Sequence, residues 1–207
     1  MKGSLLIVLV FALGILTGYS GIMGTLTAVS DYSMPVLYLL IAIIGFEFGN
    51  KNLIPTLKKI TKTALILPFL TIGGTLIAAV VTFFLLGNHP LKDYLAMSSG
   101  LGYYSLAPLL IMDFKKASAG IDAATELATI TLMANMVREI TSLTCAPLFK
   151  RLFGFYSPIA AAGVASIDVV LPVIVRTCGN SAIPLAIVQG VVLEIGVPTL
   201  VFIFCSL

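Results

Sequence analysis

Residues 98–105 read SSGLGYYS and interrupt an apolar segment that extends over 94–112 and also contains Pro108. Glycine is unfavourable in a helix interior and proline is more so, and we therefore expect the helix to break or kink here. Tyr103 and Tyr104 flank the glycine-containing break, where they either line a site or anchor the kink with amphipathic rings.

A second apolar segment, 158–177, carries Gly163, Asp168 and Pro172 in its interior, and we expect it to be interrupted as well. A break at membrane depth persists only where other protein or a water-filled cavity satisfies the freed backbone groups. Two interrupted segments in one chain therefore indicate a transport site.

The composition excludes several classes of protein. Of the 207 residues, 59% are hydrophobic and 10% are charged, whereas soluble domains carry about 25% charged residues. Twelve basic and nine acidic residues give too small a surplus for nucleic-acid binding. The three cysteines (Cys145, Cys178 and Cys205) do not suggest a disulfide framework, and no Cys/His spacing suits zinc. We expect an all-α polytopic membrane protein, embedded in a lipid bilayer, with no metal and no cofactor.

Seven apolar segments can be marked, and together they predict a single transmembrane domain over 1–207. The first is interpreted as a retained span, with a cleaved signal peptide as the alternative. The lysine-rich loop after the second segment should be cytoplasmic, which places the N-terminus inside and the C-terminus outside the cytoplasmic (inner) membrane. The segments are 4–24, 33–49, 63–87, 94–112, 119–148, 158–177 and 182–206.

Two membrane topologies agree with an N-terminus inside and a C-terminus outside. In one, all seven segments cross the membrane. In the other, five cross and 94–112 and 158–177 are re-entrant hairpins. We favour seven crossings, because 94–112 is long enough to span.

Segment 119–148 carries a polar stripe deep within its length. At about 100° per residue, four polar residues fall within roughly 60° of Asn135 on a helical wheel. A charged side chain near the bilayer centre costs about 2.5–3.5 kcal/mol, so this helix should lie inside a bundle. The four residues are Thr131, Arg138, Glu139 and Ser142.

Glu139 and Asp168 are the two acids expected deepest in the membrane. A carboxylate removed from water favours its protonated form, and it can then exchange a proton for a cationic substrate. These two acids are therefore our candidates for coupling transport to protons. Arg138 either locks helices together or takes part in binding. Gln189 and Glu194, in the last segment, either pack or line the site.

Five stretches carry a resemblance to the LysO-type bacterial lysine exporters. The more specific are LAMSSGLGYYSL at 95–106 and SIDVVLP at 166–172, the latter followed by Arg176-Thr177. The others are GFEFGN at 45–50, Arg138-Glu139, and AIVQG at 186–190 with Pro198. The resemblance implies export of L-lysine and its analogues from the cytoplasm in antiport with protons. It also implies a fold like the inverted-repeat antiporters with broken helices.

The resemblance also suggests functional residues and partners. Glu139 and Asp168 match the acids thought to couple transport in that family. Many members are longer at the N-terminus, so the chain resembles the large part of a split transporter whose small membrane partner supplies further spans. Whether the chain also forms a homo-oligomer is left open. Gln189 and Glu194 depart from the residues usual in the family. The substrate-binding candidates are Asn135, Arg138, Ser98, Ser99, Gly100, Gly102, Tyr103, Ser105, Ser166, Pro172, Arg176 and Gln189.

Two alternatives remain. A sodium/proton antiporter or a sodium-coupled organic-anion carrier of similar broken-helix fold would use the same carboxylates. A structural membrane subunit without a transport path would use them only to lock helices. An enzyme is not expected, because no nucleophile–base pair or metal cluster is visible.

Overall fold

The computed structural model describes residues 13, 16, 39 and 62–207, and this part of the chain contains helices and no strand. The chain divides into two compact units, residues 1–51 and 52–207. The predicted segments 4–24 and 33–49 lie outside the described residues, apart from three exposed helical leucines at 13, 16 and 39.

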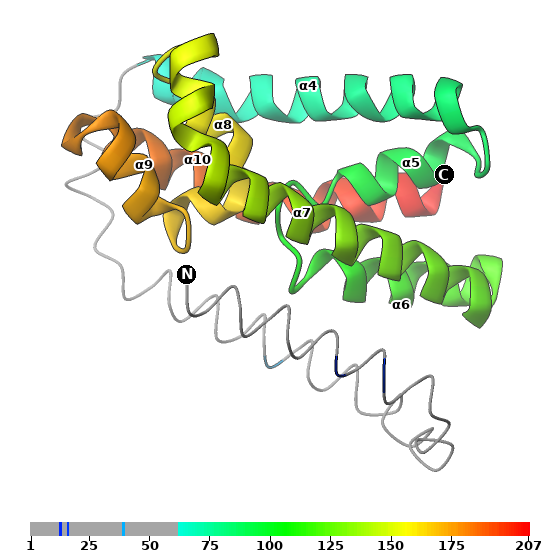
Figure 1. The fold of residues 1–207 in the computed structure, drawn as a ribbon. Helices are drawn as coiled ribbons and strands as arrows, with labels where there is room; N and C mark the ends of the chain where they lie inside the picture. Colours follow the sequence, from blue (N-terminus) through cyan, green and yellow to red (C-terminus); the bar gives the residue numbers. More distant parts are fainter. Residues whose placement is uncertain (1–12, 14–15, 17–38, 40–61) are drawn as a thin grey trace. The chain divides into compact units, whose positions relative to one another are not determined.

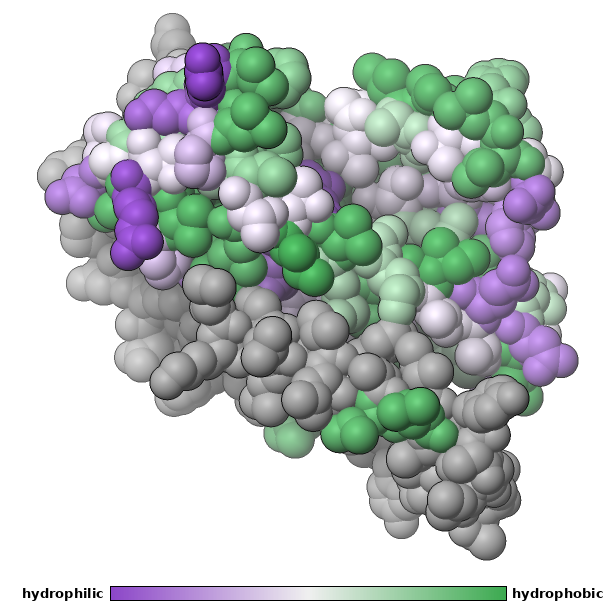
Figure 2. All heavy atoms as spheres, in the orientation of Figure 1, coloured by the Kyte–Doolittle hydropathy of each residue, from purple (hydrophilic) through white to green (hydrophobic). Residues whose placement is uncertain are grey.

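Two described helices are long and apolar enough to cross a membrane. They are α4 (Lys62–Leu86) and α10 (Ile183–Ser206), and they confirm the predicted segments 63–87 and 182–206 to within a residue. Phe84 of α4 is 79% exposed, and Figure 2 shows hydrophobic spheres over much of this helix. Such an exposed apolar face suits contact with lipid.

The predicted break in 94–112 is present, and it turns the chain back on itself. Helix α5 (Leu91–Ser98) and helix α6 (Ala107–Ala119) are joined by residues 99–106. Asp93, at the start of α5, pairs with Lys115, near the end of α6, at 2.6 Å. Because the outer ends of the two helices meet, they form an antiparallel hairpin, here called the first hairpin (Figure 1).

The predicted break in 158–177 forms a second hairpin. It consists of α8 (Ser157–Ala162), the 3₁₀ helix η2 (Gly163–Ile167) and α9 (Leu171–Cys178). Its outer ends also meet, since the Cys178 thiol donates to the Phe155 carbonyl at 3.6 Å. The short helix η3 (Asn180–Ala182) then leads into α10.

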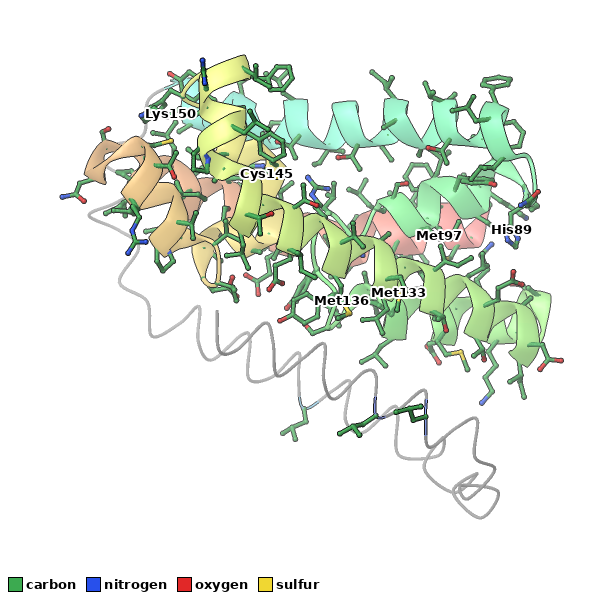
Figure 3. All side chains as sticks on the ribbon, viewed as in Figure 1. His89, Met97, Met133, Met136, Cys145 and Lys150 are labelled. Carbon is green, nitrogen blue, oxygen red and sulfur yellow. The ribbon has the colours of Figure 1, made fainter. Side chains whose placement is uncertain are left out.

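Helix α7 (Ile121–Phe153) extends five residues beyond the predicted 119–148 and connects the bases of the two hairpins. Near its start, Glu126 lies 3.5 Å from His89, which precedes the first hairpin. Near its end, the Lys150 ammonium donates to the Thr177 carbonyl of the second hairpin at 2.7 Å. Figure 3 shows His89 and Lys150 at opposite ends of the molecule, so the two hairpins enter from opposite ends.

This arrangement favours the second of the two expected topologies. The length of 94–112 predicts a full crossing, but each broken segment returns to the end at which it starts, and the number of membrane crossings stays a prediction. The physical reason lies at the tips, where backbone with positive φ reverses the chain: Leu101 has φ 48°, Gly102 φ 94° and Gly163 φ 62°. An inverted repeat relating the hairpins stays a prediction.

The two tips touch. The Val164 N–H donates to the Leu101 carbonyl at 3.0 Å, which links the tip of the second hairpin to that of the first. A Cβ atom added at Gly163 would lie 2.1 Å from the Leu101 oxygen, so the close approach requires glycine there. The breaks therefore satisfy each other's backbone groups, as interrupted helices inside a membrane must.

The two ends of this bundle differ in charge. The basic end, where α7 finishes and the second hairpin begins, carries Lys150, Arg151 and Arg176 and no acidic residue among the described ones. The opposite end, at the base of the first hairpin, has mixed charge. It carries Lys92, Lys115, Lys116, Asp93, Asp113, Asp122 and Glu126.

Candidate functional site

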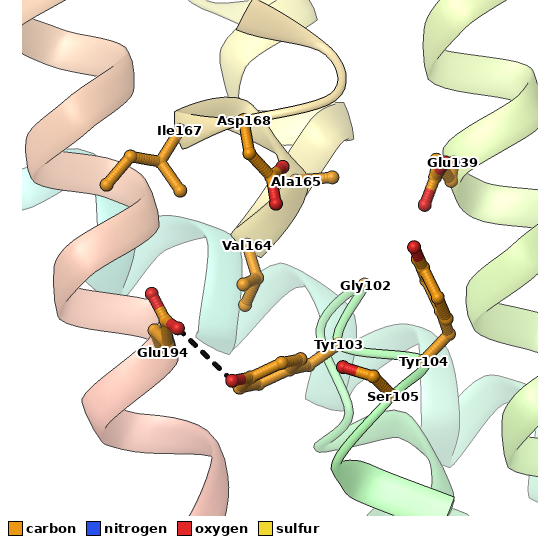
Figure 4. A pocket seen from close by; sticks show the side chains of 10 residues that line it. All are labelled: Gly102, Tyr103, Tyr104, Ser105, Glu139, Val164, Ala165, Ile167, Asp168 and Glu194. Carbon is orange, nitrogen blue, oxygen red and sulfur yellow. Dashed lines mark hydrogen bonds between the residues drawn. The ribbon is translucent and has the colours of Figure 1, made fainter. Parts of the chain in front are cut away.

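A cavity of about 60 Å³ opens where the two hairpin tips meet helices α7 and α10 (Figure 4). Four separate elements contribute to its wall, and these come from chain segments far apart in the sequence. A cavity of this size has room for water molecules beside its polar groups. The lining residues are Gly102, Tyr103, Tyr104, Ser105, Glu139, Val164, Ala165, Ile167, Asp168 and Glu194.

Both acids that the sequence singled out line this cavity, but their surroundings differ. Glu139, on α7, is only 4% exposed, and the Tyr104 hydroxyl points toward it in Figure 4. Asp168 is exposed, and its carboxylate accepts a hydrogen bond from the Val169 N–H at 2.5 Å. The expected depth of both acids in the membrane stays a prediction. Within the protein, Glu139 is buried and Asp168 is exposed. Asp168 follows η2 directly, in the turn that leads to α9, and this turn holds it at the accessible side of the cavity.

A third acid belongs to the same wall. Glu194 projects from α10, and its Oε1 accepts a hydrogen bond from the Tyr103 hydroxyl at 3.1 Å. The sequence left Glu194 open between packing and lining, and the structure places it in the lining. The signal available was an acid within the otherwise apolar 182–206, which is expensive unless it has a polar environment.

The polar stripe of α7 holds both hairpin tips. Asn135 accepts a hydrogen bond from the Gly102 N–H at 2.6 Å, at the first tip. Arg138 donates from Nε to the Ala161 carbonyl at 2.9 Å and from Nη2 to the Ala160 carbonyl at 3.1 Å. These carbonyls lie in the last turn of α8, where helical partners are missing. Neither Asn135 nor Arg138 lines the cavity.

Some of the other predicted binding residues line the cavity and some lie elsewhere. Gly102, Tyr103 and Ser105 line the cavity with the two acids. Gly100 is buried against Asn135, whose Nδ2 would lie 2.5 Å from an added Cβ. Ser98 ends α5, Pro172 is in the first turn of α9, and the exposed Arg176 is in its last turn at the basic end.

Three further polar candidates are buried and bound elsewhere. Ser99 donates to the Leu95 carbonyl at 2.7 Å, and Ser166 donates to the Ala186 carbonyl at 2.9 Å. Gln189 donates to the Thr71 hydroxyl of α4 at 2.8 Å. The Ser99 bond lies within the end of α5, whereas Ser166 joins η2 to α10 and Gln189 joins α10 to α4, and none of the three residues is part of the cavity lining.

The chemistry of the cavity suits a cation. Its polar groups are three carboxylates, two phenols and one hydroxyl, alongside the apolar side chains of Val164, Ala165 and Ile167. Carboxylates form their strongest hydrogen bonds with ammonium or guanidinium groups. Over the described residues, no group of three His, Cys, Asp or Glu side chains is arranged to hold a metal ion.

A family model described as Lysine exporter LysO matches residues 8–205. The chain belongs to this family. The family consists of transporters rather than enzymes, and with two candidate spans among the described helices this makes the chain a membrane protein.

Two curated relatives agree with this family. The chain is 30% identical over 206 residues to the lysine exporter LysO of Escherichia coli, covering 95% of this chain and 62% of that protein. It is also 30% identical over 173 residues to a putative lysine exporter of Haemophilus influenzae, covering 83% of each chain. The chain thus spans less than two thirds of the Escherichia coli relative. No solved structure matches it.

Proposed function

We propose that the chain exports L-lysine from the cytoplasm in exchange for protons. The observation that carries the proposal is the pair of acids at the meeting point of two broken hairpins, one buried and one accessible. Family membership and two relatives named as lysine exporters support the same substrate. In secondary transporters, substrate and coupling-ion sites lie where discontinuous helices meet.

The two acids have different roles in this proposal. Asp168, which is accessible, receives the ammonium group of lysine. Glu139, which is buried, holds a proton or a cationic partner, because an isolated charge is costly away from water. Binding of lysine and binding of protons are then alternatives, and this exclusion couples their movements.

The charge of the two ends supports an orientation. Basic residues gather on the cytoplasmic side of membrane proteins, so the basic end would face the cytoplasm. Export then runs from the basic end to the end of mixed charge. Moving one positive charge outward against the potential costs about 2.3 kcal/mol per 100 mV, and exchange for one proton cancels that cost.

We also propose that a small membrane protein partners this chain and supplies spans corresponding to the N-terminal part of longer relatives. The coverage of 62% of the Escherichia coli relative motivates this proposal. Coexpression with and without a candidate small protein, followed by copurification in detergent, tests it. Recovery of the chain alone, with full transport, would contradict it.

The direct test of function is uptake of labelled L-lysine by inside-out membrane vesicles with an imposed proton gradient. The chain would be assayed alone, with a candidate partner, and as the Asp168→Asn and Glu139→Gln variants. The matched control is Asp122→Asn, because Asp122 is an exposed acid at the start of α7, outside the cavity.

We expect uptake driven by the proton gradient that is lost in both cavity variants and kept in the control. Full uptake by Asp168→Asn would overturn the proposed coupling. Transport that requires a sodium gradient, with lysine ineffective, would instead establish the sodium-coupled alternative.

A further inference from the structure

Two exposed arginines, Arg151 and Arg176, lie at the basic end on separate elements. Arg151 is in the last turn of α7, and Arg176 is in the last turn of α9. The Lys150 ammonium joins these two elements by donating to the Thr177 carbonyl at 2.7 Å, and each arginine directly neighbours one end of that bond in the chain. Within the described part of the chain, neither guanidinium has a carboxylate partner. The basic end thus presents cations from α7 and from the second hairpin together.

The face of α7 that leads to Arg151 is apolar and exposed. Val137, Ile140 and Leu148 are 60%, 42% and 50% exposed, and at about 100° per residue they fall with Arg151 within roughly 60° of Val137. From Val137 to Leu148 the helix rises about 16 Å, which is comparable with the roughly 15 Å of hydrocarbon in one leaflet. When this apolar stripe lies in hydrocarbon, Arg151 reaches the depth of the lipid headgroups.

Exposed aromatic rings lie at the same end. Phe153 is 74% exposed at the end of α7, and Tyr156 is exposed directly before α8. Figure 2 shows hydrophilic and hydrophobic spheres side by side where α7 ends, at the upper left. Aromatic rings concentrate at membrane–water interfaces. Charged, aromatic and apolar side chains therefore occur together at this end, as they do where a protein meets the headgroup region.

The chemistry of this surface selects its partner. A guanidinium presents a planar set of donors that matches the oxygens of a phosphate group. Because the described part of the basic end carries three cations and no acid, it attracts a net negative charge more than a zwitterion. A soluble phosphate would contact the arginines alone, whereas a phospholipid also contacts the apolar stripe beside them.

We propose that the basic end is a binding surface for anionic phospholipids, with headgroup phosphates at Arg151 and Arg176 and acyl chains along the apolar stripe of α7. The proposal goes beyond lysine export and does not depend on it. Since one arginine is on α7 and the other is on the second hairpin, bound headgroups contact both sides of the base of that hairpin.

The test is equilibrium binding of a fluorescent phosphatidylglycerol to the purified chain in an uncharged detergent. Phosphatidylcholine with the same acyl chains is the comparison for charge, and glycerol phosphate is the comparison for a soluble anion. The variant Arg151→Gln/Arg176→Gln removes both guanidinium groups. Its matched control is Lys92→Gln/Lys116→Gln, which removes two exposed charges from the end of mixed charge. Thermal unfolding without lipid checks that each variant is folded.

We expect phosphatidylglycerol to bind the unmodified chain at least tenfold more tightly than phosphatidylcholine does. Loss of both arginines should raise the half-saturating phosphatidylglycerol concentration about 30-fold, or roughly 1 kcal/mol for each arginine, and the control should change it less than twofold. Leu148→Gln, within the apolar stripe, should also weaken binding of the lipid several-fold.

Three results would overturn the proposal. Equal weakening by the two double variants would show that overall charge, and not the basic end, attracts the lipid. Equal binding of phosphatidylglycerol and phosphatidylcholine would remove the role of charge. Displacement of the lipid by an equal concentration of glycerol phosphate would indicate a site for a soluble anion in place of a lipid surface. Because binding is measured without transport, none of these results bears on whether the chain exports lysine.

Discussion

The two hairpins share a shape and differ in how they are held. The base of the first is joined by an ion pair between Asp93 and Lys115 at 2.6 Å, and Lys115 is 3% exposed. The base of the second is joined by hydrogen bonds to the carbonyls of Thr177 and Phe155. The second hairpin also carries the cavity acid Asp168, whereas the first contributes tyrosines and a serine.

This difference suggests that the two hairpins differ in rigidity. A buried ion pair resists separation, because parting it leaves charges away from water. We therefore expect the first hairpin to be the more rigid wall of the cavity and the second, which is made of short helices, to be the one that moves.

The largest effect is expected at the contact between the tips. Gly163→Ala should abolish lysine uptake and leave little folded protein, because the new Cβ would lie 2.1 Å from the Leu101 oxygen. Gly179→Ala is the matched control. Gly179 also has positive φ, 87°, but nothing lies within 4 Å of its added Cβ. Only the cost of this backbone conformation (φ 87°, ψ 174°), about 1–3 kcal/mol, should remain there. Equal loss of folded protein in both variants, measured in detergent, would count against the tip contact.

The bases of the two hairpins should respond unequally to loss of a charge. Lys115→Met leaves Asp93 buried without its partner and should destabilise the protein by about 3–5 kcal/mol. Lys150→Met removes an exposed hydrogen bond at the second base and should cost under about 1 kcal/mol. Thermal unfolding of the purified variants measures both. Adding Asp93→Asn to Lys115→Met should restore part of the loss, and failure to do so would argue against a buried ion pair.

A smaller and more selective effect is expected at Arg138. The Arg138→Lys variant retains the charge but cannot donate to two successive carbonyls of α8 in fixed geometry. Since Arg138 holds the second tip and does not line the cavity, the maximal rate of lysine uptake should fall while half-saturation stays unchanged. A large rise in the half-saturating concentration would instead return Arg138 to a substrate-binding role.

Local sequence rules predicted the features that depend on local chemistry. Glycine and proline marked both breaks, and the apolar runs located α4 and α10 to within a residue. Helical periodicity placed Asn135, Arg138 and Glu139 on one stripe, and in the structure all three face the hairpin tips or the cavity.

The features that the sequence did not predict depend on tertiary contacts. The segment 94–112 is long enough to cross, and only the meeting of Asp93 with Lys115 shows that it turns back. Lys115 lies between the predicted segments 94–112 and 119–148, yet it is buried against that partner. The exposure of Asp168 likewise depends on the direction that the chain takes after η2, and no local sequence pattern predicts that direction.

We expect the two hairpins to enter the membrane from opposite sides, and the accessibility of introduced cysteines tests this orientation. In a background without the three native cysteines, single cysteines at Asn88 and Ser118 bracket the first hairpin, and those at Tyr156 and Asn180 bracket the second. All four positions are exposed. A membrane-impermeant thiol reagent should label 88 and 118 from outside the cell, and 156 and 180 only from the cytoplasmic side. Labelling of 88 and 118 from opposite sides would contradict the account.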